Sequence, residues 1–314
     1  MRRIAPYALL LIFLSACILL PRRQGPPDQP WVANATLTEL QRFTDRDLGD
    51  AQGVTLLDDK LYIYGDVRSV KPRCGIIKEY TLDLKPTSRW VWLKRAGKPL
   101  LLHPTGLTRH PVLGVFLGDT INQKGRIYLL DWDQAWKDGN LDHAVRAEVA
   151  DDLAVSGCRP CLVAVDGRIL LATADYNGGS RSEVRLYDPN RLLEAKKSSS
   201  PGVLLHRFAC PNWVQNLDWN QPRGQLTLIL NHIEGRGWQL DEVDLQRAIT
   251  SGRTDAPDVL CKRLIFRPHD ELEGYTPVPK NRALFVTSSS RDNLTLGRIT
   301  ELRPTASAAE SMLP

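Results

Sequence analysis

The chain repeats one strand-pair pattern along most of its length. In the clearest copy, an apolar run at 53–57 is followed by a polar break at 58–60 and by alternating apolar residues that end in Asp66. Equivalent apolar runs begin at Gly106, Leu162, Leu217 and Gly274. The pattern therefore recurs every ~55 residues, a period in the range of propellers, solenoids and other repeat arrays.

Each copy continues with further short strands of alternating polarity. A third strand is predicted at 75–82, 126–130, 183–187, 238–243 and 297–302. A fourth is predicted at 89–93, 144–149, 202–208 and 259–266. Four short alternating strands per repeat are typical of one blade of a β-propeller.

The fifth copy lacks a fourth strand, because the chain after Leu302 is mostly Pro, Ala and Ser. An unpartnered strand at 35–43 precedes the first copy. We expect residues 35–43 to pair with residues 296–302, which closes the ring and removes an exposed sheet edge. The predicted fold class is all-β, a five-bladed β-propeller closed by this N-terminal strand. The alternative, an open β-sandwich of two sheets, explains neither the period nor the missing strand.

In three copies, the segment that follows the third strand has the same pattern. Asp131, Asp188 and Asp244 each precede about two turns of residues that favour a helix. Aspartate is a good N-cap, because its carboxylate accepts hydrogen bonds from the free backbone N–H groups of the first turn. The sequence predicts three short connecting helices of one design.

The N-terminus has the features of an export signal. Arg2 and Arg3 precede an apolar run, and the run continues into Leu14-Ser15-Ala16-Cys17. This tetrapeptide resembles the lipobox of bacterial lipoproteins, in which the cysteine is lipidated and becomes the new N-terminus. The apolar run continues through 18–20, so an uncleaved membrane anchor of nearly spanning length is the alternative.

These features predict four segments. Residues 1–17 are a signal peptide with a lipobox, or a membrane anchor; residues 18–34 are a flexible tether rich in Pro; residues 35–303 are a single propeller domain; and residues 304–314 are a disordered tail. Both interpretations of the N-terminus place the domain outside the cytoplasm and attach it to a membrane. For a lipoprotein, we expect the bacterial outer membrane, with the domain facing the periplasm.

The charge of the chain argues against nucleic-acid binding. The formal net charge is +5, and Arg2, Arg3, Arg22 and Arg23 flank the N-terminal apolar run. Without them the chain is close to neutral and lacks the clustered basic face that nucleic acids require. The expected partners are the membrane and a small-molecule, glycan or protein ligand.

Six cysteines are present, five of them beyond Cys17. Cys158 and Cys161 form the single CxxC pair. No second CxxC and no nearby His completes a zinc set, and no thioredoxin-like βαβ context surrounds the pair. In an oxidising compartment we expect a structural disulfide between Cys158 or Cys161 and Cys210.

The repeat geometry predicts where polar residues gather. In a propeller blade, the start of the first strand and the end of the second lie on the same face, around the axis. The residues predicted to form a binding face there are Asp66, Asp119, Asp175, His103, Arg159, Asn216 and Glu273. Asp66, Glu273 and His103 are also the catalytic candidates. Alternatively, the three Asp residues only cap turns, because Asp readily binds local backbone N–H groups.

Two classes of function fit such a face. The first is a binding module that presents a polar, acidic surface to a ligand or partner. The alternative is a hydrolase or lyase that uses two carboxylates on a glycoside, lactone or nucleotide. Whether the chain is an enzyme stays open at this point. Ca²⁺ is a candidate cofactor, because carboxylates are the hard oxygen ligands that it prefers.

The blade pattern from Gln52 through Asp66 resembles the broad superfamily of bacterial secreted propellers, which includes gluconolactonase-like lactonases. The resemblance covers residues 35–302 at the level of the blade period. It implies a propeller fold and, by analogy, a divalent cation held on the axis by Glu, Asn and Asp. Those lactonases usually have six blades, whereas this sequence predicts five, and the resemblance implies no substrate.

Overall fold

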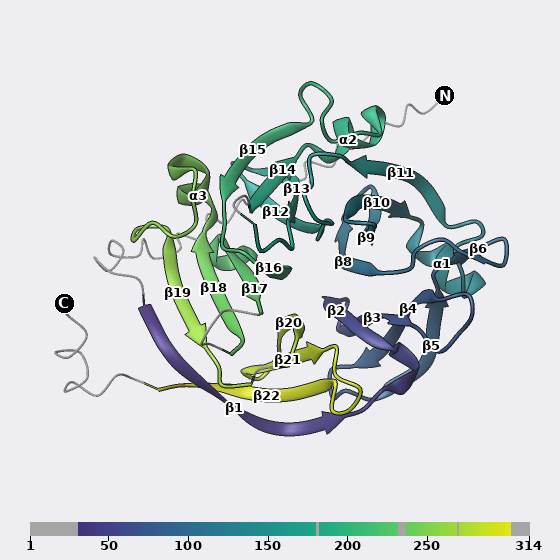
Figure 1. Ribbon diagram of the computed structural model, residues 1–314, viewed down its shortest axis with the longest axis horizontal. Helices are drawn as coiled ribbons and strands as arrows, with labels where there is room; N and C mark the ends of the chain where they lie inside the picture. Colours follow the sequence, from purple (N-terminus) through teal and green to yellow (C-terminus); the bar gives the residue numbers. More distant parts are fainter. Residues whose placement is uncertain (1–30, 180–181, 232–236, 269, 303–314) are drawn as a thin grey trace, which may run out of the picture.

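The computed structural model describes residues 31–179, 182–231, 237–268 and 270–302 (Figure 1). The predicted lipobox with Cys17, the predicted tail at 304–314 and most of the predicted tether lie outside these residues. No helix in the described part of the chain is long and apolar enough to cross a membrane.

Three four-stranded sheets follow the predicted repeats. The first contains β2 (Asp50–Leu57), β3 (Lys60–Val67), β4 (Cys74–Thr81) and β5 (Pro86–Trp92). The second contains β8 (Pro104–His110), β9 (Gly114–Ile121), β10 (Lys124–Leu130) and β11 (Val145–Asp151). The third contains β12 (Cys161–Val165), β13 (Arg168–Ala174), β14 (Glu183–Tyr187) and β15 (Leu204–Ala209). Within each sheet, consecutive strands are neighbours and antiparallel.

The remaining repeats form one eight-stranded sheet. Its order is β16-β17-β18-β19-β1-β22-β21-β20. The strands are β16 (Val214–Asn220), β17 (Gln225–Leu230), β18 (Gln239–Asp244), β19 (Leu260–Ile265), β20 (Leu272–Val278), β21 (Arg282–Thr287), β22 (Leu294–Leu302) and β1 (Trp31–Phe43). A minor hairpin of β6 (Lys94–Arg95) and β7 (Lys98–Pro99) and two 3₁₀ turns, η1 (Arg46–Leu48) and η2 (Gln221–Arg223), complete the elements.

Strand β1 is the reason for the larger sheet. It pairs antiparallel with β22, from Asn34 opposite Leu302 to Phe43 opposite Leu294, which confirms the predicted pairing of the N-terminal strand. It begins at Trp31, before the predicted boundary at residue 35, and its first residues pair in parallel with β19. The described residues therefore form four large sheets, where the sequence predicted five separate blades.

The strands are arranged as a ring. In Figure 1 the strands β2, β8, β12, β16 and β20 surround the centre, and each sheet extends outward from one of them or from a pair of them. Each of these five inner strands contacts the next one, and β20 contacts β2. The architecture is therefore mostly β and propeller-like.

The alternation of each strand explains how the sheets pack. In β3, Leu61 and Ile63 belong to one hydrophobic core, whereas Tyr62 and Tyr64 belong to another. Successive side chains of a strand point to opposite faces, so a sheet with apolar residues on both faces is buried between two neighbours. The core is thus a series of layers between sheets.

The three predicted connecting helices are confirmed. They are α1 (Trp132–Asp138), α2 (Pro189–Ala195) and α3 (Leu245–Ser251). Asp131, Asp188 and Asp244 are their N-caps, and each carboxylate accepts backbone N–H groups of the first turn. Caps of this kind typically stabilise a protein by ~1 kcal/mol each.

The predicted disulfide is not formed, and Cys74, Cys158, Cys161, Cys210 and Cys261 are free thiols. The thiol of Cys158 packs in one core and donates a hydrogen bond to the backbone oxygen of Arg126, at 3.1 Å. Cys161 packs in a different core, beside Val163. The prediction joined Cys158 or Cys161 to Cys210. Cys158 lies in a different core from the other two, and Cys210, which packs against the same core as Cys161, is also a free thiol.

Candidate functional site

The predicted binding residues fall into three groups at the end of the axis where the inner strands begin. We call this the strand-start end. The first group contains Asp66, His103 and Asp119, the second is built on Asp175, and the third contains Arg159, Asn216 and Glu273. All of them except His103 are buried.

The first group joins two neighbouring sheets through His103. The carboxylate of Asp66 at the end of β3 is fully buried, forms an ion pair with Arg73 and lies 3.3 Å from Nδ1 of His103. The backbone N–H of His103 donates to Oδ1 of Asp119, at 2.9 Å. Burial, together with the nearby charges of Arg159 and Arg73, lowers the pKa of His103 to about 4. The imidazole is therefore neutral at neutral pH.

Asp119 has a less complete set of partners. Its Oδ2 is buried and accepts no hydrogen bond from any described residue. Burial raises the pKa of this carboxyl to about 6, although backbone N–H groups, including that of His103, oppose the shift. The pKa rises because the protonated carboxyl is uncharged and avoids the desolvation cost of a buried anion.

The second group is a buried ion cluster between two sheets. Arg185 on β14 donates to both oxygens of Asp175, at 2.6 and 3.0 Å. The same guanidinium lies 3.8 Å from Asp151, at the end of β11. Tyr187 also donates to Asp151, at 2.7 Å. Asp175 further accepts the backbone N–H of Val155, so its partners are supplied by the protein itself.

The third group lies on the axis. The Nδ2 of Asn216 donates to Oη of Tyr64, at 2.7 Å, and to the backbone oxygen of Glu273, at 3.4 Å. Here the inner strands approach closely, because a Cβ on Gly274 would lie 2.8 Å from Cα of Gly53. Glycine is required at such a contact between two backbones. Tyr64 and Asn216 with these two glycines form a constriction, which we call the axial constriction.

Glu273 differs from the other acids of this end. It is 3% exposed, and none of the described residues donates a hydrogen bond to its carboxyl. Burial and the neighbouring charge of Glu271 raise the pKa of Glu273 well above its usual range, although Arg159 opposes this. Its surroundings therefore favour the protonated form of the carboxyl more than those of an ordinary glutamate do.

Glu271, two residues before Glu273, has the opposite environment. Its carboxylate accepts hydrogen bonds from Oη of Tyr176, at 3.3 Å, from Nε2 of Gln215, at 3.2 Å, and from Oγ of Ser288, at 3.2 Å. Glu271 was not among the predicted binding residues. Its signal in the sequence is its position at the start of the fifth copy, in the same alternating register as Glu273.

Arg159 lies close to these two glutamates and contacts other residues of the strand-start end. Its Nε donates to the backbone oxygen of Gln215, at 2.9 Å, and its guanidinium lies 5.2 Å from the ring centre of Tyr176. Burial lowers the pKa of Arg159, but an arginine stays charged at any ordinary pH. This places one fixed positive charge beside a pair of glutamates.

The structure does not gather the predicted calcium ligands into one set. Within the described residues, no group of three or more His, Cys, Asp or Glu side chains is arranged to hold a metal ion. Asp66 and Asp175 are instead bound by Arg73 and Arg185.

A cavity of about 520 Å³ lies at the other end of the axis, where the inner strands finish. We call this the far end. All five inner strands line it, and one lining position from each is Thr55, Thr108, Leu162, Asp218 and Thr276. The hydroxyl of Thr276 donates to Oδ1 of Asp218, at 3.3 Å. Burial raises the pKa of Asp218 to about 7, and the Thr276 hydrogen bond only partly opposes this.

Asp218 was not among the predicted site residues, because those lie at the ends of strands and Asp218 lies inside one. The available signal was an acid inside the apolar run of the fourth copy. The corresponding runs in the first, second and fifth copies carry Thr55, Thr108 and Thr276.

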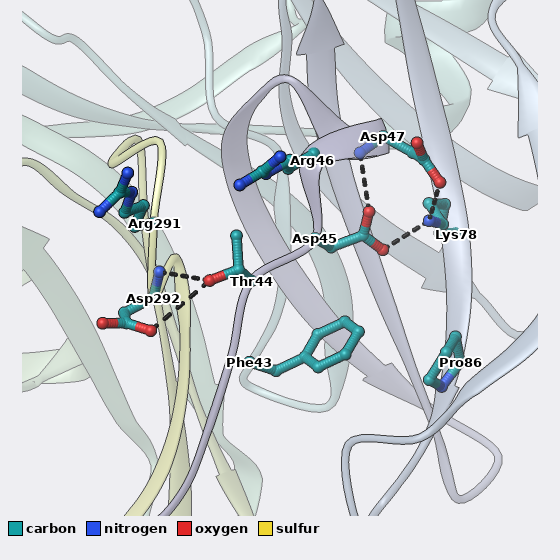
Figure 2. A pocket seen from close by; sticks show the side chains of 9 residues that line it. All are labelled: Phe43, Thr44, Asp45, Arg46, Asp47, Lys78, Pro86, Arg291 and Asp292. Carbon is teal, nitrogen blue, oxygen red and sulfur yellow. Dashed lines mark hydrogen bonds and ion pairs between the residues drawn. The ribbon is translucent and has the colours of Figure 1, made fainter.

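A further hollow of about 570 Å³ lies where β1 leads into β2 (Figure 2). Its polar side chains mostly bind one another: Asp45 and Asp47 contact Lys78, and Thr44 contacts Asp292. These contacts attach the β1–β2 connection to β4 and to the loop before β22. We interpret the hollow as part of the ring closure.

Comparisons with known proteins show no family. No family model matches the chain, and no curated protein matches it. Among solved structures, a GH43 glycoside hydrolase engineered to display endo-xylanase and exo-arabinofuranosidase activity is 10% identical, with a TM-score of 0.49 over 85% of this chain and 53% of that one. A luciferin-regenerating enzyme is 13% identical, with a TM-score of 0.48 over 86% of this chain and 96% of that one.

A gluconolactonase-like protein is 17% identical, with a TM-score of 0.36 over 64% of this chain and 61% of that one. The chain thus spans about half the length of the GH43 enzyme and less than two thirds of the gluconolactonase-like protein.

Proposed function

We propose that the protein is a hydrolase whose acid–base pair is Glu273 and Glu271. The observation that carries this proposal is the contrast between two carboxyls two residues apart. Glu273 is buried, accepts no hydrogen bond at its carboxyl from the described residues and has a raised pKa, whereas Glu271 accepts three hydrogen bonds. Carboxyls whose environments separate their protonation states are the usual basis for assigning an acid and a base.

The roles follow from these environments. Glu273, whose pKa burial raises, is the carboxyl that keeps its proton and donates it to the leaving group. Glu271 acts as the carboxylate that accepts a proton from the attacking water. Gln215 and Tyr176 hold Glu271 in place, and the charge of Arg159 stabilises Glu273 once it has lost its proton.

Glycosides are the substrate class that we propose first, because their hydrolysis requires two carboxyls and no other reactive group. Lactones and nucleotides are the other two classes to be tested.

The experiment is a hydrolysis assay with aryl glycosides, lactones and nucleotides, each with CaCl₂ or with EDTA. We expect turnover with one class, and a loss of ~10²–10⁴-fold in Glu273→Gln and in Glu271→Gln, the usual contribution of a general acid or base. Glu79→Gln is the matched control, because Glu79 is also a buried glutamate but lies on β4, hydrogen-bonded to Tyr62. Turnover that is retained in both Glu273→Gln and Glu271→Gln contradicts the proposal.

We further propose that the ring has five blades, two of which share the eight-stranded sheet. The support is that β1 meets β19 over Trp31–Asn34 alone, whereas it pairs with β22 along its remaining length. The five inner strands also form one closed series of contacts.

We also propose that the domain is attached to a membrane outside the cytoplasm, through Cys17. The support is the N-terminal sequence alone. Cys17→Ser is expected to release the protein into the soluble fraction or to block its processing. Membrane attachment that is unchanged in this variant favours the uncleaved helix.

A further inference from the structure

The cavity at the far end lies on the other side of the axial constriction from Glu273. Asn216 marks the boundary, because it lines this cavity and also donates a hydrogen bond to the backbone oxygen of Glu273. The cavity is therefore a site of its own, and its use does not depend on hydrolysis at the strand-start end.

The cavity contains one acid without a counter-charge. Asp218 and Arg109 are the charged residues among those that line it. Arg109 forms a bidentate ion pair with Asp58, which neutralises the charge of the guanidinium. Asp218 accepts one hydrogen bond from a described residue, that of the Thr276 hydroxyl. Its side chain is only partly enclosed and can be reached from the cavity.

The other titratable groups close to Asp218 are neutral. On β12, burial raises the pKa of Cys161, and on β20, burial raises the pKa of Tyr275. The nearby charge of Asp218 adds to both shifts. Strand β2 brings Thr55 and apolar residues to the cavity and no charged group. No described group in the lining therefore balances an ionised Asp218.

The remaining lining mixes apolar side chains and hydroxyls with the side-chain amides of Asn216, Asn220 and Gln221. Leu56, Leu107, Leu162, Leu217 and Pro277 form the walls. An unpaired carboxylate beside apolar walls is costly, and a cation that binds there removes this cost. The hydroxyl oxygens of Thr55, Thr108 and Thr276 are acceptors for further N–H groups of such a cation.

We propose that this cavity binds a small organic cation whose primary ammonium group pairs with Asp218. The volume of about 520 Å³ is within the range of small-molecule pockets. Charge complementarity excludes anions, and the apolar walls accommodate the carbon chain of an alkylamine.

The test uses n-butylammonium chloride as the probe and calorimetric titration of the protein at pH 8 and pH 6. The probe is a cation at both pH values, since alkylamines titrate near pH 10. Asp218 titrates at about pH 7, so the folded protein must lose a proton to bind at pH 6. We expect binding about tenfold weaker at pH 6 than at pH 8.

Two variants isolate the carboxylate. Asp218→Asn keeps the shape of the side chain and is expected to weaken binding at pH 8 at least ~10-fold, with no remaining pH dependence. Thr276→Val keeps Asp218 but removes its hydrogen bond, and is expected to move the midpoint of the pH dependence upward. Asp258→Asn, at an exposed acid outside the lining, is the matched control and binds as wild type.

Three results would overturn the proposal. One is the absence of binding to the wild type at pH 8, and another is equal binding by a folded Asp218→Asn. The third is equal affinity for n-butanol, which would show an apolar pocket that does not use the charge. The probe and these variants test the far end alone, so a failure of the hydrolase proposal leaves this result unaffected.

Discussion

The two ends of the axis are built from the same five strands but use acids differently. The strand-start end has many carboxylates, and most have protein partners: Asp66 binds Arg73, and Asp175 binds Arg185. The far end has one lining carboxylate, Asp218, with one hydroxyl partner. Whether a carboxyl group is free to bind a ligand or transfer a proton therefore depends on the partners that the protein gives it, and not on the number of acids nearby.

The strand-start end itself repeats this contrast. An acid recurs at the same position in the first three repeats, and such acids connect neighbouring sheets, as Asp175 does through Arg185 and Asp151. Glu273 occurs in one repeat and has no hydrogen-bond donor among the described residues. We infer that the recurring acids maintain the ring and that the exceptional ones carry chemistry.

The largest expected effect is that of Arg185→Met. The substitution leaves Asp151 and Asp175 buried without their cation, which destabilises a protein by ~3–5 kcal/mol. Urea unfolding monitored by circular dichroism measures this change. Arg126→Met is the control, because the Arg126–Glu148 pair is exposed and is expected to contribute ~1 kcal/mol or less. Equal effects of the two substitutions would contradict a structural role for the recurring acids.

The next effect concerns the axial constriction that separates the two ends. In Gly274→Ala, the new Cβ would lie 2.8 Å from Cα of Gly53 and 2.9 Å from the backbone nitrogen of Val54. Overpacking of this kind costs ~1–3 kcal/mol, measured as a lower midpoint of thermal unfolding. A midpoint equal to that of the wild type would show that the inner strands are further apart than in this structure.

The smallest effect is the pH dependence that His103 imposes on the strand-start end. Its pKa is about 4 in the folded protein and ~6.5 when unfolded, so between these values the unfolded state binds the extra proton. The stability contributed by His103 is therefore present above pH ~6.5 and is lost as the pH falls toward 4, by on the order of 1 kcal/mol for this partly exposed ring.

The measurement is the difference in melting temperature between wild type and His103→Gln. The wild type is expected to lose stability faster than the variant between pH 7 and pH 4.5. A difference that is constant over this range would show that the imidazole is not held in its neutral form.

The sequence predicts much of the fold because the alternation of apolar and polar residues, which identifies a strand, can be seen within a few neighbouring residues. Alternation identifies β3, and the missing strand of the fifth copy predicts the β1–β22 pairing. The parallel contact of β1 with β19 was not predictable, because residues 31–34 show no alternation that distinguishes them from a tether.

The site was less predictable, because the state of each acid depends on its hydrogen-bond and ion-pair partners, which come from distant parts of the sequence. The sequence places Asp66 and Glu273 on one face, but it does not show that Arg73 binds the first while the second lacks a donor. Asp218 was missed for a similar reason: its environment comes from four other strands distant in sequence. Likewise, the spacing of Cys158 and Cys161 does not show that their thiols lie in different cores.

The most direct test of this account is a ¹³C titration of the side-chain carboxyl signals, with Glu273→Gln and Asp218→Asn used for assignment. We expect Glu273 to titrate well above the usual range of a glutamate, and Asp218 to titrate near pH 7. We also expect n-butylammonium to lower the pKa of Asp218 and to leave that of Glu273 unchanged. Titration of both carboxyls near pH 4, with no response to the amine, would contradict it.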